Sequence, residues 1–165
     1  MWTDIFIQII ANLISGVLIA LIFFLLSDYI FKVPNLTGYW NFTTKTVQSS
    51  LKTYEGMILN YTALIWMEGK IIYGTAEKIN EYTKAKGFIE HTGEKRTKVK
   101  ISGYVLKKYL SRDRIIIHLE ESGEIRESSA IHLLKFENKS LKGNFIATAA
   151  DSEGTVEWNK KLGIN

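Results

Sequence analysis

Three histidines, His91, His118 and His132, are the side chains of this 165-residue chain best suited to metal binding or acid–base chemistry. They lie far apart in the sequence, and there is no cysteine to complete a metal site. His118 and His132 could face each other across neighbouring strands, but two imidazoles without nearby carboxylate ligands make a poor zinc site. The G-x-S-x-G, Gly-rich phosphate-loop and H-E-x-x-H motifs are also absent. We therefore predict a binding protein rather than an enzyme, with no catalytic residue, metal or cofactor.

A lysine that follows two small residues suggests a ligand site. The segment "YGTAEKINE" places Ile72, Gly74, Ala76 and Lys78 at alternate positions, so on a barrel's inner face they would form a low wall ending in a cation. Aromatic rings, hydroxyls and a lysine suit an anionic nucleotide with bases to stack. The predicted ligand-binding residues are Tyr54, Tyr61, Lys78, Thr148 and Ser152. Alternatively, the glycine and alanine relieve crowding where a strand bends.

These side chains need β-structure to position them, and beyond the membrane segment the hydrophobic pattern has a period of two. Turn signals such as "MEGK", "SRDR" and "DSEG" separate runs of strand length, and no helical pattern interrupts them. The eight predicted strands lie near 38–46, 54–66, 70–82, 97–109, 113–120, 127–136, 140–149 and 154–160. We expect a mainly β domain that closes into an eight-stranded antiparallel up-and-down, lipocalin-like barrel, because closure removes edge strands. A two-sheet sandwich is the alternative.

The N-terminal segment predicts a single transmembrane helix. From Ile5 to Leu26 no residue carries a formal charge, and a helix of this length spans about 33 Å, close to the roughly 30 Å hydrocarbon core. Basic residues before the run and a small-residue cleavage site after it, which a signal peptide requires, are both missing. We therefore expect a membrane helix over 1–32, a linker over 33–37 and a β-barrel ligand-sensing domain over 38–165.

One broad face of the predicted helix carries its polar and small residues, and the opposite face is aliphatic. Small residues let two helices approach closely, and polar side chains can pair across them. Only one hydrophobic span is present, so a partner helix would come from another chain. The residues predicted for this self-association are Gln8, Asn12, Ser15, Gly16 and Ala20. The alternative is that a single-pass anchor tolerates a few polar residues.

Charge predicts the orientation of the chain. All 21 lysines and arginines follow the span, beginning at Lys32, which favours a cytoplasmic C-terminal domain. In an eight-stranded meander, the turns at the end where the first strand begins would gather ten basic residues against Glu68, Asp113 and Glu137, and a basic rim suits an anionic leaflet. The ten are Lys70, Lys107, Lys108, Arg112, Arg114, Lys135, Lys139, Lys142, Lys160 and Lys161. Ordinary solvated loops are the alternative.

A membrane span followed by "LTGYWNF", "YEGMILNY", "GKIIYGTAEKINE", "VKISGYV" and "LKGNFIATAADSEGTVEW" resembles the transmembrane β-barrel effectors of bacterial anti-phage signalling, found with CBASS-type cyclic-oligonucleotide synthases and related systems. The resemblance covers the whole chain in architecture. The G-x-W of the first strand also occurs in lipocalins. Family members commonly have two membrane helices, whereas this chain has one.

The resemblance implies that the barrel senses a cyclic dinucleotide and that assembling membrane helices disrupt the bacterial inner membrane. A neighbouring nucleotide cyclase would then be a functional, not physical, partner. The resemblance is compatible with a nucleotide that activates the effector or one that restrains it. The alternative function is a membrane-anchored, lipocalin-like carrier of a small apolar ligand, or a membrane scaffold.

Overall fold

The computed structural model describes residues 2–29, 32–93, 96–108, 111–122, 127–137 and 139–161. The chain divides into two compact units, Met1–Pro34 and Asn35–Asn165. The second unit begins three residues before the predicted start of the barrel, because Leu36 is already fully buried in it. Residues 1, 30 and 31, within the predicted helical segment, lie outside the described residues.

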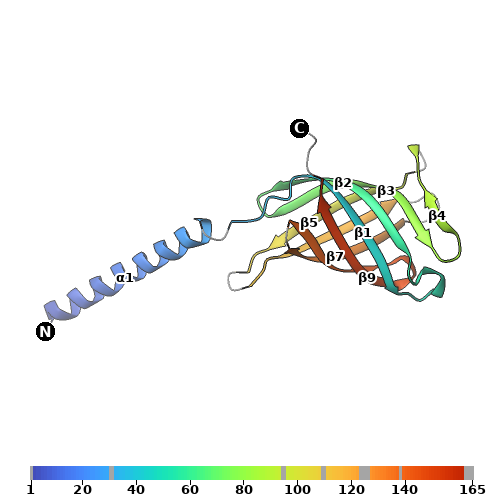
Figure 1. The fold of residues 1–165 in the computed structure, drawn as a ribbon. Helices are drawn as coiled ribbons and strands as arrows, with labels where there is room; N and C mark the ends of the chain where they lie inside the picture. The colour runs from blue at the N-terminus through green and yellow to red at the C-terminus, as the bar shows by residue number, and fades with distance from the viewer. Residues whose placement is uncertain are drawn as a thin grey trace. The chain divides into compact units, whose positions relative to one another are not determined.

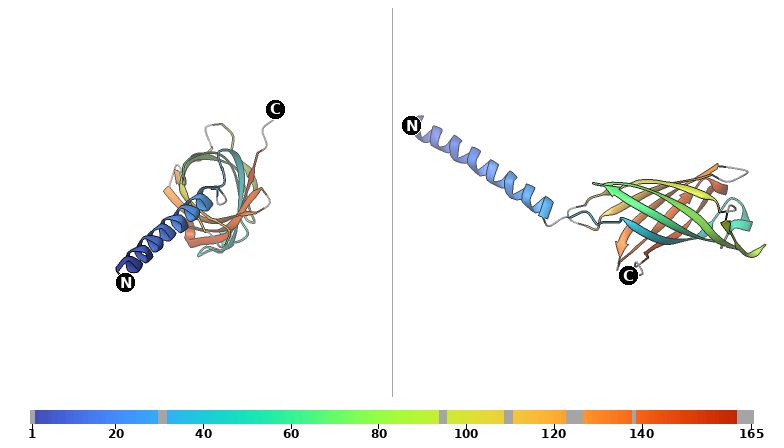
Figure 2. Two further views of the ribbon diagram at one scale, coloured as in Figure 1. Left: turned by 90° about the vertical axis from the view of Figure 1, so that its left-hand side faces the viewer. Right: turned by 90° about the horizontal axis from the view of Figure 1, so that it is seen from above.

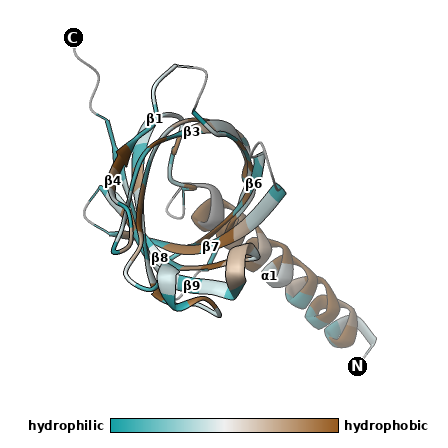
Figure 3. Cartoon of the chain, turned by 90° about the vertical axis from the view of Figure 1, so that its right-hand side faces the viewer, coloured by the Kyte–Doolittle hydropathy of each residue, from teal (hydrophilic) through white to brown (hydrophobic). Residues whose placement is uncertain are grey.

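The first unit contains one helix, α1, Trp2–Tyr29. Its stretch Trp2–Leu26 is exposed throughout and is long and apolar enough to span a membrane, the only such helix among the described residues. At 1.5 Å per residue these 25 residues extend for about 37 Å. Brown and white predominate along the helix in the hydropathy colouring (Figure 3). The prediction of one apolar helix of membrane-spanning length is therefore confirmed.

The second unit is a closed antiparallel β-barrel (Figures 1 and 2). Each strand pairs with the next strand of the ring, and pairing of β1 with β9 closes it, so the up-and-down barrel is confirmed and the sandwich is not formed. The strands are β1 Gly38–Gln48, β2 Ile58–Glu68, β3 Ile71–Thr83, β4 Gly87–Glu90, β5 Lys98–Leu106, β6 Arg114–Ser122, β7 Glu127–Glu137, β8 Ser140–Ala147 and β9 Ser152–Lys160.

A short ninth strand, β4, was not expected from the sequence. It pairs only with the far end of β3, so it extends a hairpin beyond the eight-stranded ring. The β2–β3 register shifts opposite Asn60 and Tyr61, which leaves Ile79 as an extra residue in β3. Gly87 adopts a positive φ of 70° where the hairpin turns into β4.

The barrel interior is filled at the end where β1 begins, which we call the closed end. Leu36 is fully buried there, and its carbonyl accepts a hydrogen bond of 2.7 Å from Trp40 Nε1. Its own N–H donates to the sulfur of Met67 at 3.2 Å. Buried aliphatic side chains from the surrounding strands pack beside it: Ile65, Ile72, Val105, Ile115, Leu134 and Leu141. The cavity described below lies toward the opposite end, which we call the open end.

Gly74 accounts for part of the barrel's shape. It is buried on the inner face together with Ile72 and Ala76, as expected from the alternation. A Cβ at position 74 would collide with the backbone carbonyl of Leu64 on the neighbouring strand. The alternative interpretation is therefore correct for Gly74: the glycine relieves crowding where two strands come close together.

Candidate ligand-binding site

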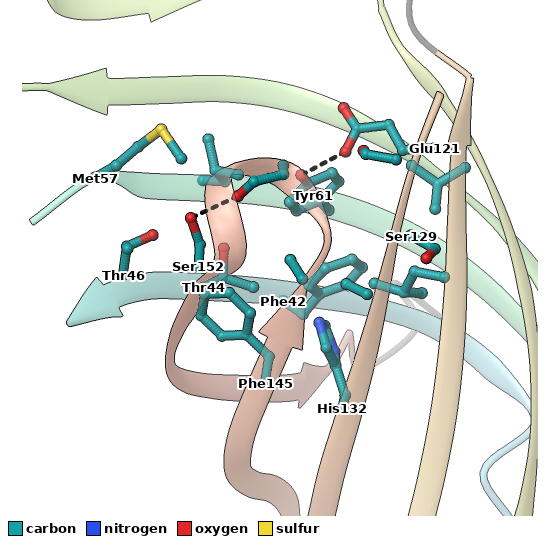
Figure 4. A pocket seen from close by; sticks show the side chains of 17 residues that line it. Phe42, Thr44, Thr46, Met57, Tyr61, Glu121, Ser129, His132, Phe145 and Ser152 are labelled. Carbon is teal, nitrogen blue, oxygen red and sulfur yellow. Dashed lines mark hydrogen bonds between the residues drawn. The ribbon is translucent and has the colours of Figure 1, made fainter. Parts of the chain in front are cut away.

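The open half of the barrel contains a cavity of about 70 Å³, shown in Figure 4. A protein-core cavity that binds benzene has roughly 150 Å³, so this cavity is about half that size and takes in only part of a ligand. Among the described residues that line it there is no lysine or arginine, and Glu121 is the one carboxylate. Hydroxyl side chains contribute to the wall: Thr44, Thr46, Ser128, Ser129 and Ser152.

Aromatic rings form the inner wall of the cavity. Phe42 stacks on Tyr61 with ring centroids 4.5 Å apart and an interplanar angle of 7°. Phe42 also stacks on Trp158, with ring centroids 4.0 Å apart and an interplanar angle of 16°. Phe145 approaches His132 at a steeper angle of 60°, with centroids 6.0 Å apart. Flat, unsaturated molecules match such walls because aromatic rings favour stacked and edge-to-face contacts.

His132 is fully buried in this aromatic surrounding. Its Nδ1 accepts a hydrogen bond of 3.2 Å from the indole Nε1 of Trp158. Burial lowers the pKa of His132 to about 3, so the ring is neutral at physiological pH. Because an indole N–H can only donate, Nδ1 carries no proton and Nε2 carries it. Nε2 has no hydrogen-bond partner among the described residues.

Charged side chains gather at the mouth of the cavity. Tyr61 donates a hydrogen bond of 3.3 Å from its hydroxyl to Glu121. Lys78 Nζ lies 3.0 Å from the same carboxylate and 3.6 Å from that of Glu81. Burial and the neighbouring Glu121 raise the pKa of Tyr61 well above 10, so its hydroxyl remains a donor. Lys78 therefore pairs with two carboxylates. Together Lys78, Glu81 and Glu121 carry a net formal charge of −1.

The segment after β4 is tied to β3 beside this cluster. His91 Nε2 lies 3.5 Å from Glu81, and Arg96 forms an ion pair of 3.1 Å with Glu77. Arg96 also donates from Nε to the backbone carbonyl of His91 at 3.1 Å. These contacts hold the unexpected hairpin next to the open end.

Three of the predicted ligand residues belong to the cavity or its mouth. Tyr61 and Ser152 line the cavity, and Lys78 lies at the mouth, paired with Glu121, which does line it. The hydroxyl of Ser152 is engaged, since it donates to the carbonyl of Ala149 at 2.7 Å.

The other two predicted residues lie outside the cavity wall. Tyr54 ends the short 3₁₀ turn η1, Lys52–Tyr54, between β1 and β2. Thr148 is exposed, and its hydroxyl exchanges hydrogen bonds with the backbone of Ser129, at 3.0 Å as acceptor and 3.3 Å as donor. Thr148 therefore closes the end of the β7–β8 ladder.

The expectation that His118 and His132 could face each other is wrong. In the β6–β7 register His118 pairs with Ile131, while His132 pairs with Ile117. A displacement of one residue puts the two rings on opposite faces of the sheet, since successive side chains alternate. Among the described residues, no three His, Cys, Asp or Glu side chains are grouped as a metal site would require.

Sequence reasoning missed the residues that shape the cavity most. Phe42 and His132 lie on inward positions of β1 and β7, as the alternation of buried residues in those strands shows. A histidine in phase with Leu134 in "IHLLKF" was the available signal for a buried imidazole. Glu121 gave no signal, because its role depends on meeting Tyr61 and Lys78 from two distant strands.

The closed end collects basic side chains, as the meander requires. The β2–β3, β5–β6 and β7–β8 connections all lie there, together with the end of β9. Several of the basic residues are paired: Lys107 with Asp113 at 3.6 Å, and Arg112 with Glu137 at 2.7 Å. The expected acidic count was one too low, because Glu157 lies opposite Lys142 at 3.1 Å.

Comparison with known proteins gives no assignment for this chain. No protein-family model matches it, and no curated protein does. The candidate site therefore stands on the geometry of the barrel.

Proposed function

We propose that this protein is a membrane-anchored effector of bacterial anti-phage signalling, whose barrel senses a cyclic dinucleotide at its open end. The observation that carries the proposal is an aromatic cavity with a lysine at its mouth, in the same chain as a helix of membrane-spanning length. The filled closed end leaves the open end as the route by which a ligand would reach the cavity. A membrane-spanning helix followed by a β-barrel is also the arrangement of the effector family that the sequence resembles, although its members commonly have two such helices.

The size of the cavity restricts how such a ligand would bind. A cavity that binds benzene has roughly 150 Å³, so a cavity of about 70 Å³ would take in part of one nucleobase, and two would not enter together. One base would contact Phe42 and Tyr61, while the sugar–phosphate ring would remain at the mouth. Lys78 would then exchange its ion pairs with Glu121 and Glu81 for contacts with phosphate oxygens.

The membrane helix would provide the output. Gln8, Asn12, Gly16 and Ala20 recur every four residues, so they form one stripe along α1. A Cβ at Gly16 would meet nothing within 4 Å, which leaves room for another helix to approach. We propose that copies of the chain associate along this stripe, with Ser15 beside it, and disrupt the bilayer.

The location follows from the same arrangement. We propose a single-pass protein of the bacterial inner membrane with its barrel in the cytoplasm. All 21 lysines and arginines of the sequence follow α1, and the closed end of the barrel, where the chain emerges from the linker, is rich in basic residues. Such residues would favour an anionic cytoplasmic leaflet.

A second candidate function is a membrane-anchored carrier of a small apolar ligand. One observation favours it: the described lining of the cavity contains no lysine or arginine, and Lys78 is already held by two carboxylates. An uncharged ligand would not need to break these ion pairs.

The test is a calorimetric titration of the full-length protein in detergent micelles with a panel of cyclic di- and trinucleotides. We expect one member to bind with micromolar or tighter affinity and Lys78→Gln to weaken it at least tenfold. Lys100→Gln is the matched control, because Lys100 lies on the neighbouring β5, is 75% exposed and pairs with Glu120 at 3.8 Å. No binding across the panel, together with no toxicity of the full-length protein in bacterial cells, would refute the effector function.

A further inference from the structure

The unpartnered nitrogen of His132 is the feature of the barrel that the fold itself does not explain. Its other nitrogen is used, because Nδ1 accepts from Trp158 Nε1 at 3.2 Å. Rotating the ring by 180° would place a carbon against that indole N–H, so the observed orientation is the favourable one. The Nε2–H group is then a buried donor without an acceptor among the described residues. Buried donors in folded proteins are nearly always paired, and an unpaired one calls for an explanation.

The cavity is where that acceptor would come from. His132 is part of the cavity wall, and Figure 4 shows its ring among Phe42, Phe145 and Tyr61. The ring meets Phe42 at 80° with centroids 5.7 Å apart, and Phe145 at 60°. These contacts of the His132 ring involve no charged side chain. The one carboxylate of the described lining, that of Glu121, is held at the mouth by Tyr61 and Lys78.

We propose that the cavity binds an uncharged, planar six-membered ring, and that His132 recognises it by donating a hydrogen bond from Nε2 to an acceptor atom of the ring. A cavity that binds benzene has roughly 150 Å³ and this one has about 70 Å³, so part of the ring would remain at the mouth. A positively charged ring would find a hydrogen-bond donor, the Nε2–H of His132, where it needs an acceptor. A ring without an acceptor would leave that donor unpaired.

The inference rests on the proposed function only in that a ligand enters the open end. The ring has two possible sources with the same chemistry: a base of a cyclic dinucleotide, or a free neutral heterocycle. In either case His132 determines specificity, because its Nε2–H can donate a hydrogen bond to a carbonyl oxygen or ring nitrogen at one position of the ligand. A plain hydrocarbon cannot accept this hydrogen bond and is disfavoured.

Pyridine and benzene are the matched probes, because they share a shape and differ by one acceptor nitrogen. Both would be titrated into full-length protein in detergent micelles, followed by the indole ¹⁵N–H signal of Trp158, which touches His132 in the same core. The measured quantity is the ratio of the two dissociation constants. Partition of the probes into micelles is the same for each variant, so it cancels when ratios are compared.

We expect the preference for pyridine over benzene to be at least tenfold greater in the wild type than in His132→Phe. His132→Gln should restore part of the preference, because a carboxamide can accept from Trp158 and still donate. Its restored preference also separates loss of the donor from loss of folding. Equal ratios in the wild type and His132→Phe would overturn the inference, as would the failure of both probes to shift the Trp158 signal.

The cyclic dinucleotide panel distinguishes this inference from the proposed function. If a cyclic dinucleotide binds and His132→Phe binds it equally well, the effector function stands and the role of His132 is refuted. If pyridine shows the His132-dependent preference and no cyclic dinucleotide binds, the role of His132 is supported and the ring comes from a free heterocycle.

Discussion

Acid should destabilise the barrel through His132, and the loss can be worked out from its surroundings. The ordinary pKa of 6.5 falls to about 3 because the ring is buried among Phe42, Phe145 and Trp158, which offer no charge to stabilise an imidazolium. The unfolded chain therefore takes up a proton below pH 6.5 that the folded protein refuses until about pH 3. This contribution to stability is complete above pH 6.5 and is lost as the pH falls.

The magnitude follows from linkage. One pKa unit corresponds to about 1.4 kcal/mol, so at pH 4 protonation of the unfolded histidine lowers the free energy of unfolding by about 3 kcal/mol relative to pH 7. Carboxylates also titrate in this range, but they do so equally in a variant that lacks only the imidazole. The difference between the wild type and His132→Gln therefore isolates the contribution of His132.

The assay is urea unfolding of the full-length protein in detergent micelles, followed by tryptophan fluorescence at several pH values from 7 to 4. The wild type should lose about 3 kcal/mol more than His132→Gln over this range. His118→Gln is the control, since the side chain of His118 is 39% exposed and its removal should leave the pH profile close to that of the wild type. Parallel profiles for the wild type and His132→Gln would refute the reasoning, as would a native-state titration of His132 near pH 6.5.

Two further predictions concern glycines with opposite surroundings. Gly74→Ala should lower the free energy of unfolding by about 1–3 kcal/mol, because its Cβ would meet the backbone of the neighbouring strand; an unchanged urea midpoint would contradict this close approach. Gly16→Leu together with Asn12→Leu should abolish self-association in membranes and toxicity in cells while leaving membrane insertion unchanged. Crosslinking and membrane fractionation measure the two quantities, and wild-type crosslinking in the double variant would count against the helix stripe.

Local pattern was enough to predict the ring of eight strands, because buried residues recur at every second position over part of most strands, most clearly in β1 and β6. The β4 strand escaped prediction because its four residues, Gly87–Glu90, are too few to show an alternation. The extra residue Ile79 in the β2–β3 register also leaves no periodic trace. The face on which a histidine lies depends on the same kind of detail. His118 and His132 sit on neighbouring strands, yet a displacement of one residue sends only His132 into the core.

The site was predicted in part for a related reason. Alternation identifies which side chains point inward, and so it found Tyr61 and the position of Lys78, whereas Ser152 followed from its place at the end of the barrel opposite the linker. The alternation does not reveal which residue neutralises a charged side chain at the cavity. The partner of Lys78 is Glu121, which β6 brings to it from the far side of the β5 strand. Pairing between side chains distant in sequence is a property of the closed barrel and not of any segment.

The charge at the mouth separates the two candidate ligand classes. Lys78 is shared by Glu121 and Glu81, so a dianionic ligand meets a site with a net charge of −1 and must displace a carboxylate from the lysine. Glu121→Gln removes one of the repelling charges and leaves Tyr61 an amide oxygen to bond. A cyclic dinucleotide should then bind about fivefold more tightly, as expected for about 1 kcal/mol of repulsion in a partly exposed site.

An uncharged ring feels none of this repulsion, so the affinity of Glu121→Gln for pyridine should equal that of the wild type. Raising the salt concentration offers a second comparison, because screening alters only the binding of the charged ligand. If Glu121→Gln binds a cyclic dinucleotide more tightly and pyridine with unchanged affinity, the phosphates lie beside Lys78 and a base lies against His132. Tighter binding of both probes would instead mean that Glu121 narrows the passage into the cavity, and the electrostatic argument would fail.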